Sequence, residues 1–563
     1  MKKSLLIAFL ICYFVSPTVS QSTNNCSITN TNKLLLIGDS WAHFMLIYRG
    51  YSKSFEQHGF PDITEVGNNT VIMGAQAETW SEGPGPRLIK KALRENKDLT
   101  MVAITLGGND VMWDYEAPEP YEMLEPEATR FMLELDTIID IIEEERPELE
   151  ILIVGYDYPN MVEPLLDNPY NPYWDTYISM NYPTPEQLNL GLQYFEKFRM
   201  EWPRIKNDPK VHFLYDCGLM QYTFGQEKPV PVYPFDPYPA FSVPFPNGDP
   251  RYPTPQVAMG LNGFDTYHLG PEGFKVLADH HLHTFMLDNL RGYPNKVCNA
   301  TMEEESGNIN ENGYVKKGQI SAGRNNNKDD VKAIISIATD DIPDNAVITS
   351  ASLFITRQAQ TGDRIFEGLN PSNAIIDIKN GFFGINALLA KEDYDAIADG
   401  YDIACMVGNA PQKNYTLRFD ILPEYFDRIN VIGTTQFRLA ITPEGNKSAE
   451  MLFYNTEYPR DSSYFLPHLD VKYTLSTPTK NNIVNTYYLY PNPAKDVLYL
   501  RNNTYPLEDG IVYIIDSKGS VVFQQNTYEA QSVLTMNISN LPSGKYIVQM
   551  SSKEGIHNMT FVK

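Results

Sequence analysis

The first half of the chain alternates short apolar runs with amphipathic stretches. Two of those stretches, Pro126 to Glu145 and Pro185 to Trp202, have the spacing of apolar positions that is typical of helices. The apolar runs are short and largely aliphatic, as in buried parallel strands: Lys33 to Ile37, Thr70 to Met73, Thr100 to Leu106, Leu149 to Val154 and Val211 to Tyr215. Strands that alternate with helices predict a doubly wound sheet with helices on both faces, in a domain over residues 21–297.

The second half lacks helical periodicity and shows short β-type runs separated by Gly, Pro and Asn. This pattern predicts two all-β sandwiches, one over residues 313–475 and a smaller one over residues 487–563. Residues 298–312 and 476–486 are polar and poor in hydrophobic side chains, so we predict that they are linkers. The expected architecture is therefore an α/β/α domain followed by two β-sandwich domains.

Residues 1–20 have the pattern of a signal peptide, with Lys2 and Lys3 before an apolar region from Leu5 to Val15. That region is shorter than the roughly 20 apolar residues of a membrane-spanning helix, and we predict no transmembrane segment elsewhere. Lys and Arg number 45 against 70 Asp and Glu, which gives a net charge of −25. So acidic a chain disfavours nucleic acid and anionic membranes as partners.

Small polar residues follow two of the predicted strands. Ser40 comes directly after an apolar run that ends in Gly38, and Asn109 follows another run that ends in two glycines. Because the carboxyl ends of parallel strands form one edge of the sheet, we expect both side chains at that edge. Asp265 and His268 precede a helical pattern and are spaced to lie on one side of a turn. Together the four residues supply a nucleophile, an oxyanion donor, an orienting carboxylate and a base.

These motifs resemble the SGNH, or GDSL-type, hydrolase family. Gly-Asp-Ser40, Gly-Gly-Asn109-Asp and Asp265-x-x-His268-Leu occur in the family's order, within roughly residues 30–290. The resemblance implies a flavodoxin-like α/β/α fold in which Ser40 attacks an ester carbonyl and His268 takes its proton. It also implies that Asp265 holds His268, and that Asn109 and two backbone N–H groups, one of them from Ser40, form the oxyanion hole.

The second backbone donor departs from the family pattern. A glycine is usual at this place, whereas this chain has Ala77, with Gly74 three residues earlier as the alternative. A backbone N–H needs no particular side chain, so both assignments stay open. Trp41, Trp80 and Trp113 follow the motif stretches and are candidate substrate-binding residues, with plain core packing as the alternative.

No motif in the chain indicates a cofactor. His280, His281 and His283 have a spacing that suits a metal, but no carboxylate or cysteine stands at a supporting spacing. We therefore predict no metal site and expect these histidines to be partly exposed on the helix that follows His268.

The cysteines number four once Cys12 leaves with the signal peptide. Cys26 precedes the first predicted strand and Cys298 follows the last helix of the α/β domain. Domain termini often lie close together, and an exported chain meets an oxidising compartment. We predict a disulfide between Cys26 and Cys298, with Cys217 and Cys405 as buried free thiols. Four unpaired cysteines are the alternative.

Both β regions carry resemblances of their own. The stretches Asp341 to Phe354 and Pro467 to Tyr473 resemble DNRLRE-type β-sandwich modules of secreted polysaccharide-active bacterial proteins, which implies a glycan-binding or spacer role. Residues 487–563 closely resemble the C-terminal sorting domain of the type IX secretion system of Bacteroidetes. That resemblance implies passage through the periplasm and export to the cell surface or the medium by the type IX machinery.

The sequence thus favours a secreted serine esterase that removes ester groups from an extracellular glycan, and the acyl group expected is acetyl. The segment from Gln221 to Met259, rich in Pro, Tyr and Phe, is expected to shape the substrate site. One alternative is a lipase-like hydrolase of longer acyl esters, which needs an apolar acyl groove. Another is a glycan-binding protein or adhesin that uses a hydrolase fold only as a scaffold.

Overall fold

A computed structural model describes residues 31–112, 115–229, 236–292, 295–300, 303–363, 373–443, 445–455, 463–475, 487–502, 507, 510–516, 520–527, 533–552 and 555–563. The predicted signal peptide and the predicted linker 476–486 lie outside the described residues, as do Cys26 and Trp113. No helix in the described part of the chain is both long enough and apolar enough to cross a bilayer.

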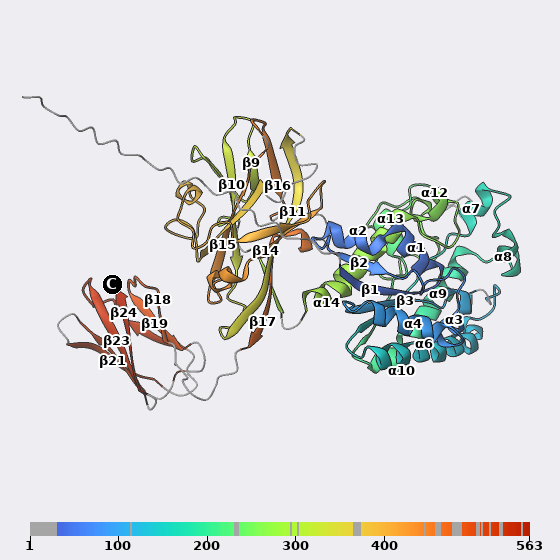
Figure 1. Ribbon diagram of the computed structural model, residues 1–563, viewed down its shortest axis with the longest axis horizontal. Helices are drawn as coiled ribbons and strands as arrows, with labels where there is room; N and C mark the ends of the chain where they lie inside the picture. The colour runs from blue at the N-terminus through green and yellow to red at the C-terminus, as the bar shows by residue number, and fades with distance from the viewer. Residues whose placement is uncertain are drawn as a thin grey trace, which may run out of the picture. The chain divides into compact units, whose positions relative to one another are not determined.

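A parallel sheet organises the first domain (Figure 1). Its strands run in the order β2-β1-β3-β4-β5. Their bounds are Thr31–Gly38 for β1, Ile63–Val66 for β2, Met101–Thr105 for β3, Glu150–Val154 for β4 and Val211–Leu214 for β5. The order reverses between β1 and β3, and ligands of open α/β sheets bind at such a switch point, beyond the carboxyl ends of the strands.

One predicted strand is wrong. The second strand is Ile63–Val66, whereas Thr70 to Met73 contributes only an isolated bridge between Val71 and Gly38. The side chains of β2 alternate between buried and half-buried, because β2 is an edge strand. It therefore lacks the continuous apolar run by which the buried strands were predicted.

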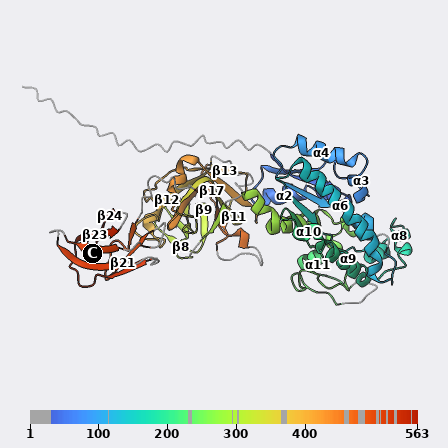
Figure 2. The ribbon, with the colours of Figure 1, turned by 90° about the horizontal axis from the view of Figure 1, so that it is seen from below.

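Helices cover both faces of this sheet, with α2 and α13 on one face and α4 and α6 on the other (Figure 1). Figure 2 shows the domain from below, on the side of α4 and α6. In α6 the buried residues recur at helical spacing, from Ala128 through Phe131, Met132 and Leu135 to Ile142, which packs one face of the helix into the core. The helices are α1 Ser40–Tyr48, α2 Gly50–Gln57, α3 Ala77–Ser81, α4 Gly85–Glu95, α5 Gly108–Val111, α6 Glu125–Glu145, α7 Val162–Asp167, α8 Trp174–Ser179, α9 Pro185–Met200, α10 Pro203–Asn207, α11 Leu219–Phe224, α12 Gly260–Gly263, α13 Pro271–His281 and α14 Leu287–Arg291. This is the predicted three-layer α/β/α fold.

An antiparallel β-sandwich follows. Its strands are β6 Asn295–Asn299, β7 Gly307–Asn310, β8 Val315–Lys317, β9 Ile320–Arg324, β10 Asp330–Ala338, β11 Ala346–Gly362, β12 Ala374–Asn380, β13 Ala404–Val407, β14 Thr416–Ile421, β15 Thr434–Ile441, β16 Ala449–Phe453 and β17 His468–Leu475. β6 pairs with β17, and β7 pairs with β10. Residues 298–312, expected to be a linker, therefore contribute strands to the sandwich, which begins near residue 295.

The sandwich and the α/β domain share a polar and aromatic contact inside one compact unit. Arg418 of β14 donates to the carbonyl of Gly59 at 3.1 Å and to the two carboxylate oxygens of Asp62 at 2.9 and 3.1 Å. Phe354 of β11 packs on Phe60, with 5.4 Å between the ring centroids. A bidentate Arg–carboxylate pair with little solvent access is a specific contact, so β14 is joined to the loop before β2 by a defined geometry.

The last domain is built from two small antiparallel sheets. One contains β18 Tyr487–Tyr490, β19 Val497–Asn502 and β22 Val533–Asn537, and the other contains β20 Gly510–Ile515, β21 Val521–Thr527, β23 Lys545–Ser552 and β24 Gly555–Val562. Leu498, Leu500, Val512 and Ile514 are buried together in its core. Their alternation with outward-facing residues explains why the sequence predicted a sandwich here.

The predicted disulfide between Cys26 and Cys298 is wrong. Cys298 is a buried cysteine on β6, directly opposite Leu469 of β17, and neither it nor the buried Cys217 is disulfide-bonded. Cys405, expected to be free, is disulfide-bonded. Cys298 belongs to the interior of the sandwich rather than to a terminus of the α/β domain, so the assumption behind its pairing does not hold.

Alkylation of the mature protein tests this cysteine assignment. Cys217 and Cys298 should react with iodoacetamide only after unfolding and without any reductant, because both are buried and neither is disulfide-bonded. Cys405 should react only after reduction. Mass spectrometry of peptides from the non-reduced protein checks this, and a disulfide-linked peptide that contains Cys298 would contradict it.

Candidate active site

Ser40 begins α1 immediately after β1. Gly38, two residues earlier, runs so close to β3 that an added Cβ would lie 2.2 Å from the carbonyl oxygen of Thr105, so only glycine fits there. Asp39 caps α1, because its carboxylate accepts the N–H of Trp41 at 2.9 Å. This tight strand-to-helix turn presents Ser40 at the carboxyl edge of the sheet, as expected.

His268 lies against Ser40 from the loop before α13. Its Nε2 is 2.8 Å from the Oγ of Ser40, and its Nδ1 is 3.0 and 3.1 Å from the two carboxylate oxygens of Asp265. A carboxylate can only accept at Nδ1, so that nitrogen carries the proton and Nε2 accepts the serine hydroxyl. The three residues therefore have the relative arrangement of a serine-hydrolase triad.

Asp265 is held by the backbone as well as by His268. The N–H groups of Tyr267 and His268 each donate to its Oδ1 at 2.9 Å. Burial acts to raise the pKa of Asp265, but the hydrogen bond and charge of His268, together with these N–H groups, hold that pKa below its usual value. The carboxylate is thus ionised and fixed in orientation beside the imidazole.

Asn109 lies at the start of α5, beside the loop that follows Val71. Its side-chain Nδ2 donates to the carbonyl of Ala75 at 3.0 Å, and its backbone carbonyl accepts from the side chain of Gln76 at 2.8 Å. These bonds orient the amide and tie the two loops together. Asn109 lines the same cavity as Ser40 and His268, which is where an oxyanion donor is needed.

The geometry distinguishes the two candidates for the backbone donor. The N–H of Ala77 donates to the carboxylate of Asp110 at 2.9 Å, and Ala77 is fully buried. Its N–H therefore cannot serve the oxyanion hole. Gly74 lines the cavity, with a φ of 74° that favours glycine. Of the two, only Gly74 is placed to face a bound substrate.

A cavity of about 260 Å³ extends from Ser40 into the domain. Its polar lining residues are Ser40, Asn109 and His268, together with the carboxylates of Asp39 and Asp157. The remainder is lined mostly by apolar and aromatic residues: Trp41, Met73, Met112, Tyr156, Pro159, Tyr173, Met180, Leu188, Leu192 and Tyr267. Such a site suits an ester whose acyl part is apolar.

Two of the three predicted tryptophans can be placed. Trp41 lines the cavity and packs edge-on against Tyr156, with 5.1 Å between the ring centroids. Trp80 is fully buried in the core and is not among the residues that line the cavity, so it is not positioned to bind substrate. Trp113 lies outside the described residues.

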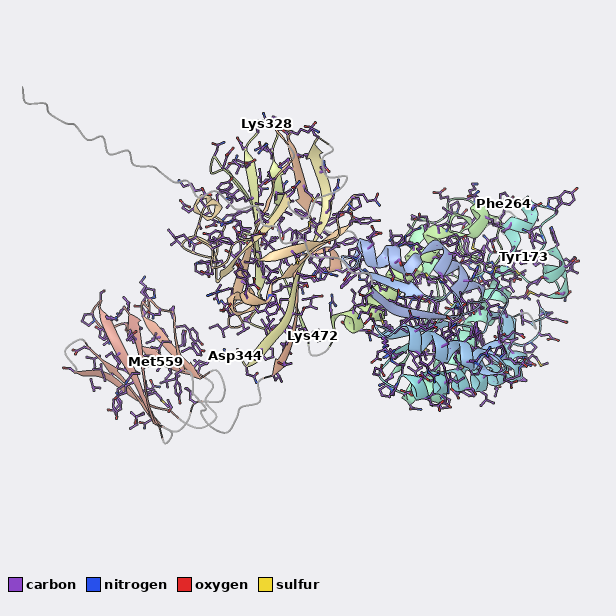
Figure 3. The ribbon with its side chains drawn as sticks, in the orientation of Figure 1. Tyr173, Phe264, Lys328, Asp344, Lys472 and Met559 are labelled. Atoms are coloured by element: carbon purple, nitrogen blue, oxygen red, sulfur yellow. The ribbon has the colours of Figure 1, made fainter. Side chains whose placement is uncertain are left out.

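The apolar wall of the cavity comes from a part of the chain that the sequence did not single out. It is built by α9 and by the segment around α7 and α8, which includes Tyr173 (labelled in Figure 3). The ring of Tyr173 packs edge-on against that of Tyr267, with 5.1 Å between the centroids. None of the described residues between 221 and 259 lines the cavity. That segment packs on α9 instead, where Asn189 donates to the carbonyl of Tyr252 at 2.6 Å.

The three clustered histidines have structural partners. His281 is completely buried rather than partly exposed, and it bonds to Tyr51 at 2.7 Å and to Asp216 at 3.0 Å. His283 stacks on Tyr464 of the sandwich, with 3.4 Å between the ring centroids. Helical spacing placed these residues on one helix, but it could not tell which face was covered.

Comparison with known proteins identifies the last domain. Residues 488–563 match the family described as the secretion system C-terminal sorting domain, which confirms the predicted sorting domain. The chain is therefore a secreted or cell-surface protein. No curated protein matches it significantly.

Solved structures give distant likenesses. The lipase Lip_vut3 from a goat rumen metagenome is 10% identical over 45% of this chain and 97% of its own, with a TM-score of 0.27. Est24, a carbohydrate acetylesterase from Sinorhizobium meliloti, is 13% identical over 46% and 99%, with a TM-score of 0.24. An immunoglobulin-like β-sandwich protein from Bacteroides vulgatus is 24% identical over 14% and 82%, with a TM-score of 0.12. The chemistry of the site therefore rests on its own geometry.

Substitution of Asn109 tests the oxyanion assignment. Asn109→Ala should lower kcat roughly 10²- to 10³-fold, equivalent to about 2.7–4 kcal/mol, because it removes one donor to the transition state. Asn109→Asp has nearly the same shape but places a negative group beside the developing oxyanion, so its loss should be at least as large. Steady-state kinetics on an activated ester measures both, and near-normal kcat in Asn109→Asp would contradict the assignment.

Proposed function

We propose that this chain is a secreted serine hydrolase of carboxylic esters. The observation that carries the proposal is the hydrogen-bonded series of Ser40, His268 and Asp265, at 2.8 and 3.0 Å. These distances are within the range for direct proton transfer from a nucleophile to its base. Ser40 is also nearly buried, at 8% exposure, so its hydroxyl faces the cavity rather than bulk water.

In the first half of the reaction, His268 removes the proton from Ser40 as its Oγ attacks the ester carbonyl carbon. The tetrahedral intermediate carries a negative charge on the former carbonyl oxygen, which Asn109 and the backbone N–H groups of Ser40 and Gly74 stabilise. The protonated imidazole is stabilised by Asp265 and then gives its proton to the departing alkoxide. An alcohol leaves, and the acyl group stays bound to Ser40.

In the second half, water replaces the alcohol. His268 removes a proton from this water, whose oxygen attacks the acyl carbon, and the same oxyanion donors stabilise the second intermediate. The bond to Ser40 then breaks as His268 returns the proton to its Oγ. A carboxylic acid is released and the enzyme regains its starting state, so the atoms and protons balance.

The lining of the cavity indicates which acyl group the substrate carries. The sequence favoured acetyl, because a polar and aromatic approach to the site was expected. The cavity is instead largely apolar, and Met112, Met180, Leu188 and Leu192 are among the residues that line it. A single acetyl methyl leaves most of this surface uncovered, so we favour the alternative of an acyl group several carbons long.

The alcohol part of the ester is inferred from the other two domains. Export by a sorting domain and an appended β-sandwich support an extracellular substrate, and the resemblance of the sandwich supports a glycan. A longer acyl chain esterified to an extracellular sugar satisfies both the apolar cavity and these features. A non-catalytic scaffold has no need for the aligned series from Ser40 to Asp265, so the adhesin alternative has less support.

Loss of the nucleophile or the base tests the proposal itself. Ser40→Ala and His268→Ala should each remove most of the activity on nitrophenyl esters, and the double variant should be little worse than either, because the residues act as a unit. Titration with a fluorophosphonate should label wild type at Ser40 and leave Ser40→Ala unlabelled. A Ser40→Ala protein that hydrolyses esters at nearly the original rate would remove the proposal.

A series of acyl lengths tests the nature of the cavity. Hexanoyl and octanoyl esters should exceed acetyl in kcat/KM by about tenfold or more, since each buried methylene contributes roughly 0.8 kcal/mol. Met112→Trp should narrow the cavity and shift the preference back towards acetyl. Met123→Trp is the matched control, because Met123 is 59% exposed and does not line the cavity. A wild-type preference for acetyl would restore the original expectation.

A further inference from the structure

Tyr156 lies just after β4, between the two loops that carry the catalytic groups. Its hydroxyl donates to the Oδ2 of Asp39 at 2.6 Å and accepts the backbone N–H of Gly108 at 3.1 Å. Asp39 immediately precedes Ser40, and Gly108 immediately precedes Asn109. One buried hydroxyl therefore bonds to both the nucleophile turn and the oxyanion loop.

Each of these two bonds acts on a part of the backbone that aims a functional group. Asp39 also accepts the N–H of Trp41 at 2.9 Å, so its carboxylate sets the first turn of α1 and with it the direction of Ser40. Gly108 is the first residue of α5, and its position sets that of the Asn109 amide. A change in either loop alters the distance between nucleophile and oxyanion donor.

We infer that Tyr156 is a positioning residue that fixes Ser40 relative to Asn109 by joining Asp39 to Gly108. This inference rests on the proposed hydrolysis of esters and adds a residue that the triad does not include. The three-residue geometry accounts for proton transfer. Tyr156 accounts for the alignment of the Ser40 hydroxyl with the Asn109 amide, because these two groups follow different strands.

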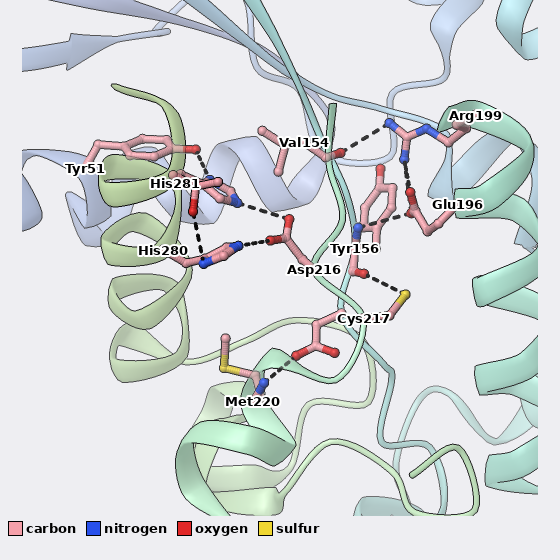
Figure 4. A network of polar contacts seen from close by, with 12 residues as sticks. Tyr51, Val154, Tyr156, Glu196, Arg199, Asp216, Cys217, Met220, His280 and His281 are labelled. Atoms are coloured by element: carbon pink, nitrogen blue, oxygen red, sulfur yellow. Dashed lines mark hydrogen bonds and ion pairs between the residues drawn. The ribbon is translucent and has the colours of Figure 1, made fainter. Parts of the chain in front are cut away.

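The backbone of Tyr156 is itself held by a buried polar network (Figure 4). Its backbone N–H donates to Glu196 at 3.1 Å, and its carbonyl accepts from the thiol of Cys217 at 3.5 Å. Glu196 pairs with Arg199 at 3.0 Å, both side chains are completely inaccessible, and Arg199 also donates to the carbonyl of Val154 at 3.2 Å. Removing one partner from such a pair leaves a buried charge, so Tyr156 rests on groups that resist displacement.

The protonation of Asp39 makes the role of Tyr156 visible in the dependence of activity on pH. The groups that act on Asp39 are Tyr156, the N–H of Trp41, His268 and Asp110. Burial raises the pKa of Asp39 to about 6, while the bond from Tyr156 opposes that rise, as do the N–H of Trp41 and the charge of His268. Without the hydroxyl the pKa of Asp39 rises further, so the carboxylate is protonated at a higher pH and its hold on the turn weakens there.

Tyr156→Phe is the test, because it removes the hydroxyl and keeps the ring against Trp41. We expect kcat to fall between about tenfold and a hundredfold, as for a small misplacement of reacting groups, with KM changed much less. The acid limb of the kcat/KM profile should also move to higher pH, so that the loss is greater at pH 6 than at pH 9.

Tyr158→Phe is the matched control, two residues further along the same segment. Tyr158 is also fully buried, but its hydroxyl donates to the carbonyl of Asn247 at 2.5 Å and makes no contact with Asp39 or Gly108. Thermal unfolding of both variants shows whether each is folded. The control should keep the wild-type pH profile and lose much less kcat.

The outcomes distinguish failure of the role of Tyr156 from failure of the proposed ester hydrolysis. If wild type hydrolyses esters and Tyr156→Phe matches Tyr158→Phe in kcat and pH profile, Tyr156 is only a packing residue and the inference is overturned. If Tyr156→Phe is folded, slower and shifted in its acid limb, the inference is supported. If wild type hydrolyses no ester and takes up no fluorophosphonate, the proposed function fails first, and the inference fails with it.

Discussion

The parallel pairing of β1 with β3 is the constraint on which the rest of the site depends. The two strands run so close at their carboxyl ends that Gly38 opposes Thr105 without room for a side chain, and the N–H of Asp39 donates to the carbonyl of Thr105 at 3.1 Å. The segments that follow β1 and β3 must then leave the sheet side by side. The turn that carries Ser40 and the loop that carries Asn109 thus become neighbours because of backbone hydrogen bonds between β1 and β3, whatever side chains they carry.

The residues that were predictable are those whose neighbours in sequence report their place in the fold. Ser40 and Asn109 follow buried strands within a few residues, and Asp265 and His268 interact across a single turn, so the sequence indicated that all four lie at one edge of the sheet. The edge strand Ile63–Val66 was missed because only one of its faces is covered. The alignment of Ser40 with Asn109 depends on the order of the strands in the sheet. Periodicity does not give that order, and only the resemblance to a flavodoxin-like fold implied it.

The cavity wall could not be predicted, and the reason is physical. Leu188 and Leu192 of α9 face inwards at helical spacing, and that spacing is the same whether a helix covers a filled core or an empty cavity. The choice between Ala77 and Gly74 depended on a carboxylate, Asp110, that is distant in sequence from both. The pairing of cysteines likewise depended on where β6 lies, and a polar stretch that reads as a linker gave no sign of that.

The pairing of β6 with β17 has a consequence for how the chain acquires its structure. These are the first and last strands of the sandwich, so residue 299 pairs with residue 468, from which it is separated in sequence by nearly the whole domain. Contacts between such distant residues form slowly, because a long loop must close before they contribute. Cys298 lies in this ladder and is buried there, so its protection from alkylating reagents reports the pairing of β6 with β17 separately from the folding of the domain that holds Ser40.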